Sequence, residues 1–258
     1  AGGFAAVAMA VHPLGKGQSR IALAYHKLNR LMTDGASGGL PIRGPEVALR
    51  VKSRGGDRLV GPTDICFSPD GKTLYLTGYV WKTGNYTGFA SAYHVVMRMD
   101  YASPKKPTVF LGDMKKRGRA NGLFCVPTSV RCDARGRVYV ADYLNNRIQV
   151  HAPDGKLLKT LKTPHPALIQ IDRKTGNIWS FSWPVIGPNS RDMKEYRFNP
   201  ERVTPAADFL GTFDQPVKSK PLGLPSIDAS GRGQHVTGGQ IYRAVMDFSA
   251  QEPTLWMV

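Results

Sequence analysis

The stretch from Val126 to Leu161 alternates apolar and polar residues in four short runs, each bounded by polar turn residues. Alternation with a period of two predicts half-buried β-strands. The turns carry Gly136, the pair Asn145-Asn146 and the triplet Pro153-Asp154-Gly155, which are residue types that stabilise tight reversals. Four consecutive antiparallel strands form a meander, the unit of a β-propeller blade, and the expected strands are residues 128–132, 137–141, 147–151 and 156–161.

Looser copies of this pattern fill the rest of the 258 residues. Equivalent first turns recur at Gly71, Gly136, Gly176 and Gly231. The sequence therefore predicts an all-β fold, a single β-propeller domain of four-stranded antiparallel blades over residues 1–258. Five blades are readable, at approximately 4–51, 61–112, 126–161, 164–213 and 222–258.

Three details of this assignment depend on local pattern alone. The first strand is expected over residues 4–11, followed by a turn at 12–18. The second blade carries an expanded turn over residues 81–92, between its second and third strands. The fourth blade is expected to use residues 194–198 as its third strand and 207–213 as its last.

The clearest blade also resembles a known repeat. Pro127, Val130, Asp133, Gly136, Val138 to Asp142, Asn145 to Ile148, Val150, Asp154-Gly155 and Leu158 reproduce the NHL repeat closely. The resemblance implies a propeller and no particular activity. Because this family usually closes with about six blades, five blades indicate either a closed five-bladed ring or a fragment of a longer chain or assembly that supplies another blade. The second interpretation is favoured.

Charge suggests a class of partner. The chain has 35 Lys and Arg against 19 Asp and Glu, a net charge of +16. This excess indicates either a solvated basic surface or an anionic partner, which could be nucleic acid, an acidic polysaccharide, a membrane surface or an acidic protein. The basic runs at residues 105–106 and 115–119 contain no aromatic residue, so nucleic acid is the less favoured partner, although it stays open.

Cysteine and hydropathy patterns add little about location. No apolar run approaches the roughly 20 residues of a membrane span, so no transmembrane segment is expected. Cys66, Cys125 and Cys132 form no metal or haem motif and are expected to be buried free thiols, with a Cys125–Cys132 disulfide as the alternative. The compartment is left open, with the periplasm or the extracellular space favoured.

Ligands of propellers bind where the starts of the inner strands and the turns between second and third strands converge. A ligand-binding site is therefore expected at this channel mouth. Arg30 is expected to be freer than Arg147 to meet an anion, because Tyr25 stands where Asp142 pairs with Arg147 across the turn. The candidates are Thr63, Asp64, Thr128, Ser129, His165 and Ser226, with His26, Tyr143 and Arg30 from the matching turns.

Histidine spacing bears on metal binding. Peptidylglycine amidating lyases are similar in having Pro-His at the starts of inner strands, where three His bind zinc. Pro164-His165 matches once, whereas the neighbouring blades have Pro62-Thr63 and Pro127-Thr128. We therefore expect no metal and no cofactor, with His165 the one metal candidate. Serine-nucleophile and phosphate-loop motifs are absent, so no catalytic residue is assigned.

The expanded turn of the second blade contains Trp81, Tyr86 and Phe89. These side chains either pack on their own blade or form a partner-binding loop, because aromatic anchors on loops often dominate interface energy. Taken together, the sequence favours a non-catalytic scaffold that binds a protein or anionic partner. The alternatives are a propeller enzyme, a lyase or hydrolase with a metal in the central channel, and a propeller domain or subunit of a larger redox complex.

Overall fold

A computed structural model describes most of the chain, namely residues 8–24, 27–33, 47–48, 58–60, 62–83, 88–102, 105–185, 191–199, 202–224, 244–250 and 252–257. Within these ranges the regular secondary structure is almost entirely β-strand, with one short α-helix and one 3-10 turn.

Four antiparallel sheets of four strands follow one another along the chain. Blade one contains β1 (Ala8–Gly15), β2 (Gln18–Ala24), β3 (Lys27–Thr33) and β4 (Val47–Ala48). Blade two contains β6 (Asp64–Phe67), β7 (Thr73–Thr77), β10 (Val95–Asp100) and β11 (Thr108–Gly112). Blade three contains β12 (Pro127–Cys132), β13 (Val138–Asp142), β14 (Arg147–His151) and β15 (Leu157–Lys162). Blade four contains β16 (Pro166–Ile171), β17 (Ile178–Ser182), β18 (Ala206–Phe209) and β19 (Leu222–Gly223), and a hairpin of β20 (Ala244–Asp247) and β21 (Thr254–Met257) follows it.

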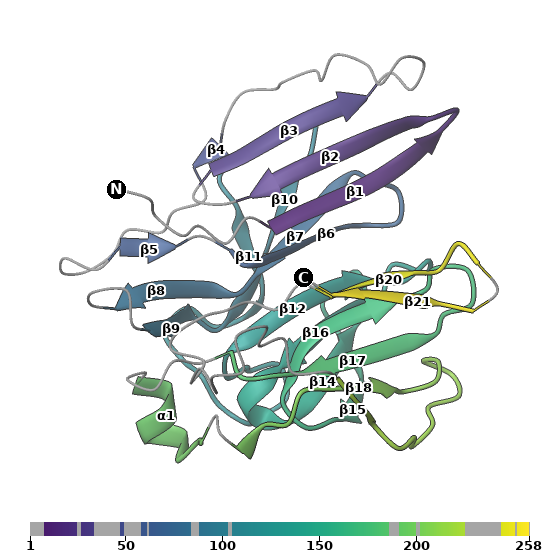
Figure 1. The fold of residues 1–258 in the computed structure, drawn as a ribbon. Helices are drawn as coiled ribbons and strands as arrows, with labels where there is room; N and C mark the ends of the chain where they lie inside the picture. The colour runs from purple at the N-terminus through teal and green to yellow at the C-terminus, as the bar shows by residue number, and fades with distance from the viewer. Residues whose placement is uncertain are drawn as a thin grey trace, which may run out of the picture.

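The first strand of each blade packs against the first strand of the next. β1 contacts β6, β6 contacts β12, β12 contacts β16, and β16 contacts β20. Separate apolar clusters fill the spaces between successive blades, so the core is divided among the blade interfaces. Figure 1 shows the sheets following one another in this order. This radial arrangement of meanders is a β-propeller, which confirms the predicted fold class.

Blade three confirms the strand prediction most closely. All four strands lie within one or two residues of their expected bounds. Gly136 and Gly155 adopt φ of 79° and 95°, and Asn146 adopts φ of 54°, so each turn uses a left-handed residue. Gly71 and Gly176 take the same role in blades two and four, with φ of 66° and 80°. The predicted first turns of these three blades are therefore present, while Gly231 lies outside the described residues.

Blade one differs from the expectation at its first turn. β1 continues to Gly15, and the reversal consists of Lys16 and Gly17, with φ of 50° and 75°. A two-residue turn with both residues left-handed matches the twist of a β-hairpin. The predicted turn at residues 12–18 was therefore too long, because His12 and Pro13 still pair with Arg20 and Ser19.

The expanded turn of blade two is a second small sheet. β8 (Tyr79–Thr83) and β9 (Gly88–Tyr93) form a hairpin, and β5 (Arg58–Val60) pairs with β8 on its other side. The region expected to be a loop therefore consists largely of strands. Trp81 lies on β8 and Phe89 on β9, while Tyr86 lies outside the described residues.

Blade four corrects two strand assignments. Residues 194–198 do not form a strand, because α1 (Arg191–Tyr196) occupies this segment. The third strand is instead β18, and the fourth is β19, which the sequence pattern assigned to the fifth blade. The boundary between the fourth and fifth blades therefore lies after Gly223. Of the predicted fifth blade, the described residues contain the hairpin β20–β21.

Side chains form hydrogen bonds with the backbone N–H and carbonyl groups at the free edge of the inner strands. Each inner strand pairs with one neighbour, so its other edge has backbone groups without a ladder partner. The carboxylate of Asp64 accepts from the backbone N–H of Val130, and the hydroxyl of Ser129 accepts from the backbone N–H of Ile169, at 2.9 and 3.1 Å. Arg131 donates to the Val130 carbonyl, and Arg173 donates to those of Cys132 and Phe67.

The three cysteines are buried and unbridged, as expected. Cys66 and Cys132 face each other between blades two and three, with their sulfur atoms 3.9 Å apart. The alternative Cys125–Cys132 disulfide is absent.

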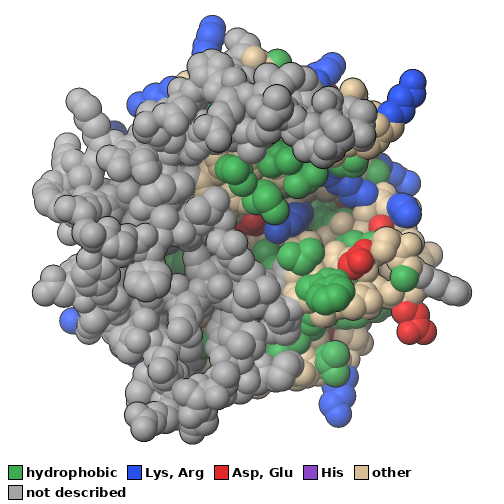
Figure 2. Space-filling model, turned by 45° about the horizontal axis from the view of Figure 1, so that its top comes forward, with side chains coloured by type: hydrophobic (Ala, Val, Ile, Leu, Met, Phe, Trp, Pro, Cys, Tyr) green, Lys and Arg blue, Asp and Glu red, His purple; other side chains and the backbone are tan. Residues whose placement is uncertain are grey.

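The surface combines basic and apolar side chains. In Figure 2, Lys and Arg project at several separate places around the outline of the molecule. Several large apolar side chains are also exposed, among them Met9 on β1 and Trp256 on β21, at 64% and 62%. The helices of the described ranges are too short to cross a bilayer.

Candidate functional site

His165 lies at the entrance to blade four, directly before β16. Its backbone is left-handed, with φ of 41°. Its N–H donates to the side-chain oxygen of Asn146 at 2.9 Å, and the Asn146 carbonyl accepts from Thr163 at 3.2 Å. Asn146 therefore holds the connection between blades three and four in place from both sides of Pro164.

The left-handed backbone at His165 is a feature of the repeat. Val126, directly before β12, has φ of 58°, and its N–H donates to the imidazole of His94 at 2.9 Å. Both residues precede a proline that pairs with the end of the second strand, Pro127 with Asp142 and Pro166 with Ser182. The strain at His165 is therefore not by itself evidence of chemistry.

This strand pairing also changes which residues of the other blades are equivalent to His165. The sequence comparison aligned Pro164-His165 with Pro127-Thr128, but the strand register aligns Pro166 with Pro127 and His165 with Val126. In the sequence of blade two, Gly61 precedes the corresponding proline, Pro62. The equivalent positions in blades two and three still contain no His. In addition, the described ranges contain no group of three or more His, Cys, Asp or Glu side chains that could hold a metal ion.

The His165 ring stacks in an aromatic cluster. Its centroid lies 5.3 Å from that of Tyr143 and 5.1 Å from that of Phe198, and those two rings are 5.6 Å apart. Tyr143 is fully buried and donates from its hydroxyl to the Trp183 carbonyl at 3.0 Å. Tyr143 thus lies beside His165, as expected, but as a packing partner whose hydroxyl is already engaged.

A cavity of about 350 Å³ opens beside His165 on blade four. Its walls come from the connection before β16, from β17, β18 and β19, and from the segment that precedes β18. The polar lining residues are Thr163, His165, Ser180, Ser182, Arg202, Thr204 and Asp208. The residues that carry the imidazole, the guanidinium and several hydroxyls therefore border one open, largely apolar pocket, which is the usual form of a small-molecule site.

The protonation of His165 suits a proton acceptor. Burial lowers its pKa below 6.5, and a hydrogen bond with the Tyr143 backbone partly opposes this effect. The Nδ1 atom is buried and has no hydrogen-bond partner among the described residues. The shift in pKa therefore favours the uncharged form of the ring.

Asp64 and Ser129 come together as expected, but in a structural role. Ser129 donates to the Asp64 carboxylate at 2.7 Å, and Arg131 pairs with the same oxygen at 2.6 Å. Both residues are buried and also accept from the inner-strand edges. Their hydrogen-bonding capacity is therefore used to connect the blades.

The two threonines also have local partners. Thr128 donates to the Pro166 carbonyl at 2.9 Å. The backbone N–H of Thr63 donates to the Thr77 and Gly78 carbonyls, each at 3.1 Å. Thr63 also packs on Gly78, where a Cβ atom would lie 1.8 Å from the threonine hydroxyl. Neither threonine lines the His165 cavity.

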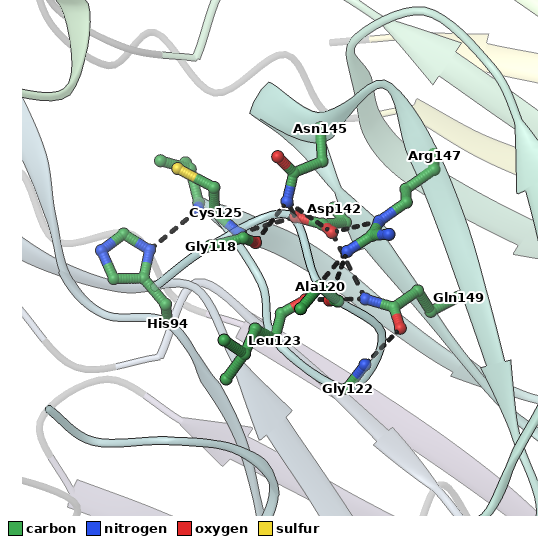
Figure 3. A network of polar contacts seen from close by, with 11 residues as sticks. His94, Gly118, Ala120, Gly122, Leu123, Cys125, Asp142, Asn145, Arg147 and Gln149 are labelled. Atoms are coloured by element: carbon green, nitrogen blue, oxygen red, sulfur yellow. Dashed lines mark hydrogen bonds and ion pairs between the residues drawn. The ribbon is translucent and has the colours of Figure 1, made fainter. Parts of the chain in front are cut away.

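Asp142 and Arg147 form the predicted salt link, at 2.7 Å. Figure 3 shows that this pair is the centre of a larger network. Arg147 also donates to the Ala120 and Leu123 carbonyls, while Asn145 donates to Asp142 and to the Gly118 carbonyl. The network therefore holds the basic loop, residues 113–121, against blade three. Arg117 of this loop additionally pairs with Glu195 of α1.

Several predicted site residues fall outside what the structure describes. His26, Tyr86 and Ser226 lie outside the described residues. Arg30, Trp81 and Phe89 lie on β3, β8 and β9, and only their strand positions are known. Their binding of a ligand or a partner stays a prediction from the sequence.

The sequence pattern missed Arg202 and Asp208 of the cavity. Asp208 lies on β18 and Arg202 lies in the segment before it. The sequence pattern made this strand the last of its blade, so no repeat position pointed to these two residues. The sequence pattern identified Asn146 as a turn residue. Its hydrogen bond with the His165 N–H joins blade three to the start of blade four, and a repeat pattern does not show such contacts.

The fold and this site define a β-propeller with a cavity beside its fourth blade. Residues 47–171, just under half of the chain, match the family described as the SMP-30/Gluconolactonase/LRE-like region. This description does not name the NHL repeat, which remains a resemblance of blade three.

Two curated relatives share a shorter stretch. Peptidylglycine alpha-amidating monooxygenase of Rattus norvegicus is 36% identical over 97 residues, which are 37% of this chain and 9% of the relative. The enzyme of Mus musculus is 35% identical over 97 residues, with the same shares of 37% and 9%. The match therefore spans less than a tenth of these relatives.

Solved structures show partial likeness. Regucalcin of Agrobacterium tumefaciens, described as a calcium-binding protein, has a TM-score of 0.43 and 15% identity, covering 84% of this chain and 64% of that one. Virginiamycin B lyase of Staphylococcus aureus has a TM-score of 0.43 and 12% identity, covering 86% of this chain and 57% of that one.

Proposed function

We propose that this propeller is a hydrolase that opens small lactones or esters in the cavity beside His165. The observation that carries the proposal is the half-buried His165 imidazole, which lines one cavity together with Arg202. An uncharged imidazole and a cation that line the same cavity are suitable groups for removing a proton from water while negative charge develops on a substrate oxygen.

The names of related proteins support an enzyme more than a scaffold. The matching family description includes gluconolactonase, and the curated relatives are named as amidating monooxygenases. These are different reactions, so the names support catalysis in general, and the choice of hydrolysis comes from the cavity. The non-catalytic scaffold, which the sequence pattern favoured, is therefore the second interpretation.

The proposed steps use residues of this chain alone. His165 accepts a proton from water, whose oxygen adds to the carbonyl carbon of the lactone. Arg202 stabilises the negative charge that develops on the carbonyl oxygen. The ring C–O bond then breaks, and the imidazolium returns its proton to the leaving oxygen. The product is a hydroxy acid, and its carboxylate would again be held by Arg202.

The metal of the sequence-based enzyme alternative is not part of this proposal. Three protein ligands are the usual minimum for a catalytic zinc site, and the described residues bring no such group together. No step is therefore assigned to a metal ion.

A panel of aldonolactones and aryl esters tests the proposal. The wild-type protein is expected to hydrolyse at least one substrate class, and His165→Ala should lower kcat/KM by about 10²-fold or more, the usual contribution of a general base. His151→Ala is the control, because His151 is a buried histidine that does not line the cavity. Absence of turnover across the panel by folded wild-type protein, or an equal loss in both variants, would contradict the proposal.

The net charge of +16 favours a second candidate function, the binding of an anionic polymer through surface Lys and Arg. Retention on heparin should then fall steeply as salt increases, because counterions are released on binding. Retention that is insensitive to salt would exclude charge-driven binding.

A further inference from the structure

The inner strands end on the side of the propeller opposite to His165. His12 on β1 and Arg20 on β2 belong to blade one, whereas Arg173 follows β16 in blade four. All three side chains reach toward the end of β6 and the turn that follows it, at Phe67 and Gly71. Residues from two blades that are not neighbours therefore meet at blade two.

The two arginines have only uncharged partners. Arg20 donates to the Gly71 carbonyl at 2.7 Å, and its guanidinium lies 5.4 Å from the centre of the Tyr101 ring. Arg173 donates to the Phe67 carbonyl at 2.8 Å and to the Cys132 carbonyl at 3.3 Å. Within the described residues neither guanidinium forms an ion pair. Because arginine has five N–H donors, each retains donors for a further acceptor.

His12 lies close enough to both cations to feel their charge. Its side chain packs against Gly71, where a Cβ atom would come within 2.3 Å of the ring, and its ring centroid is 5.7 Å from that of Phe67. The residue is 9% exposed, and its Nδ1 has no hydrogen-bond partner among the described residues. The space around the ring is therefore fixed by the fold, while one of its nitrogens is unused.

The electrostatics of His12 show that the cluster is cationic. Burial lowers its pKa, and the charges of Arg173 and then Arg20 lower it further. Asp70 opposes this effect, but its carboxylate is held by Ser68 at 2.6 Å and is directed to the backbone of Lys72. Two permanent positive charges consequently act on one buried imidazole without a carboxylate bound to either.

We propose that His12, Arg20 and Arg173 form a binding site for an oxyanion, the phosphate group of a small molecule. Two guanidinium groups from different blades offer about the charge of a phosphate dianion, and their planar N–H donors suit its oxygens. The buried His12 ring borders the site and responds to a change of charge at the two guanidinium groups. This site is separate from the His165 cavity, and its existence does not depend on the proposed hydrolase activity.

The first test titrates inorganic phosphate into the wild-type protein at constant ionic strength and follows the ring resonances of His12 by NMR. We expect a saturable shift of His12, with His151 and His165 unchanged as internal controls. Acetate at equal ionic strength distinguishes a phosphate from a carboxylate ligand, and it should bind more weakly. Failure of phosphate to move His12, or binding of acetate in preference to phosphate, would overturn the proposal.

Substitutions then test whether Arg20 and Arg173 bind the phosphate. Arg20→Gln and Arg173→Gln should each weaken phosphate binding about tenfold or more, the usual loss for a charge-assisted hydrogen bond. Arg98→Gln is the matched control, because Arg98 is an exposed arginine that stacks on Phe110, 5.0 Å from its ring centre. Since Arg173 also caps two carbonyls, its variant is first checked for folding, and Arg20→Gln provides an independent measurement. Equal phosphate affinity in wild-type protein and in folded Arg20→Gln would also refute the site.

Discussion

The Asp64 carboxylate of blade two lies 2.7 Å from the Ser129 hydroxyl of blade three. The same carboxylate accepts from the Val130 N–H and pairs with Arg131, so one buried side chain serves three donors of the next blade. We expect Asp64→Ala to lower the free energy of unfolding by about 3 kcal/mol, because it leaves a buried arginine and an edge N–H unpaired.

Urea denaturation checks this prediction. Asp154→Ala is the control, since Asp154 is an exposed turn residue that accepts from the Lys156 N–H at 2.9 Å. A loss no greater than that of the control would show that Asp64 does not connect the blades.

Replacement of Arg147 should destabilise blade three and change its pH dependence. Arg147→Met is expected to cost about 3 kcal/mol or more, because it leaves the buried Asp142 carboxylate without its cation. Burial already raises the pKa of Asp142, while its hydrogen bonds and Arg147 oppose that rise. Because the folded-state pKa of Asp142 is raised, the contribution of this group to the free energy of unfolding is fully present below about pH 4, the unfolded-state pKa. It is lost as the pH rises through the folded-state pKa. The variant should raise this pKa further and extend the loss toward neutral pH.

Unfolding curves at several pH values measure this effect. Arg135→Met is the matched control, because the Arg135 side chain is 71% exposed. If the variant and wild type have parallel stability profiles from acid to neutral pH, Arg147 does not tune Asp142.

Phe198 should control the titration of His165. Burial holds the pKa of His165 below 6.5, and Phe198 covers one side of its ring. Phe198→Ala is expected to raise this pKa toward 6.5, as measured by NMR titration. A depressed pKa stabilises the fold above pH 6.5 and the contribution is lost as pH falls through the folded value, so the variant should also weaken this acid sensitivity.

Phe213→Ala is the control for this experiment, because Phe213 packs on Arg137 and Lys159 instead. An unchanged His165 pKa in Phe198→Ala would show that other groups desolvate the ring.

The thiols of the native protein should resist modification. Cys66, Cys125 and Cys132 are all buried, and the pKa of Cys132 is raised well above its ordinary value by its contact with Cys66 and by burial. We expect labelling with a thiol reagent to be slow in buffer and to reach all three cysteines after unfolding in guanidinium. Fast labelling of any cysteine in the native protein would contradict the buried arrangement.

The sequence predicted blade three well because its turns determine its strands. Gly136 and Gly155 each occur where the backbone is left-handed, so local residue preference and fold agree. In blade four, residues 194–198 alternate polar and aromatic side chains, a pattern that a short helix also accommodates. Contacts that are distant in sequence accompany the helix, since Arg117 pairs with Glu195 and stacks on Tyr196.

The site was harder to predict than the fold. His165 stands between two prolines, and only the pairing of Pro166 with Ser182 shows which proline begins the strand. Arg202 lies in the segment before β18, to which no repeat position was assigned. Asp64 and Ser129 were expected to bind a ligand, but their position on inner strands is also where unpaired backbone edges need acceptors.

These edge contacts have a direction along the chain. Asp64 of blade two serves the edge of blade three, and Ser129 of blade three serves the edge of blade four. In both cases the accepting side chain comes earlier in the sequence than the backbone N–H group that donates to it. During translation, each blade can therefore present its acceptor before the next blade leaves the ribosome, which allows the propeller to be assembled in the order of its synthesis.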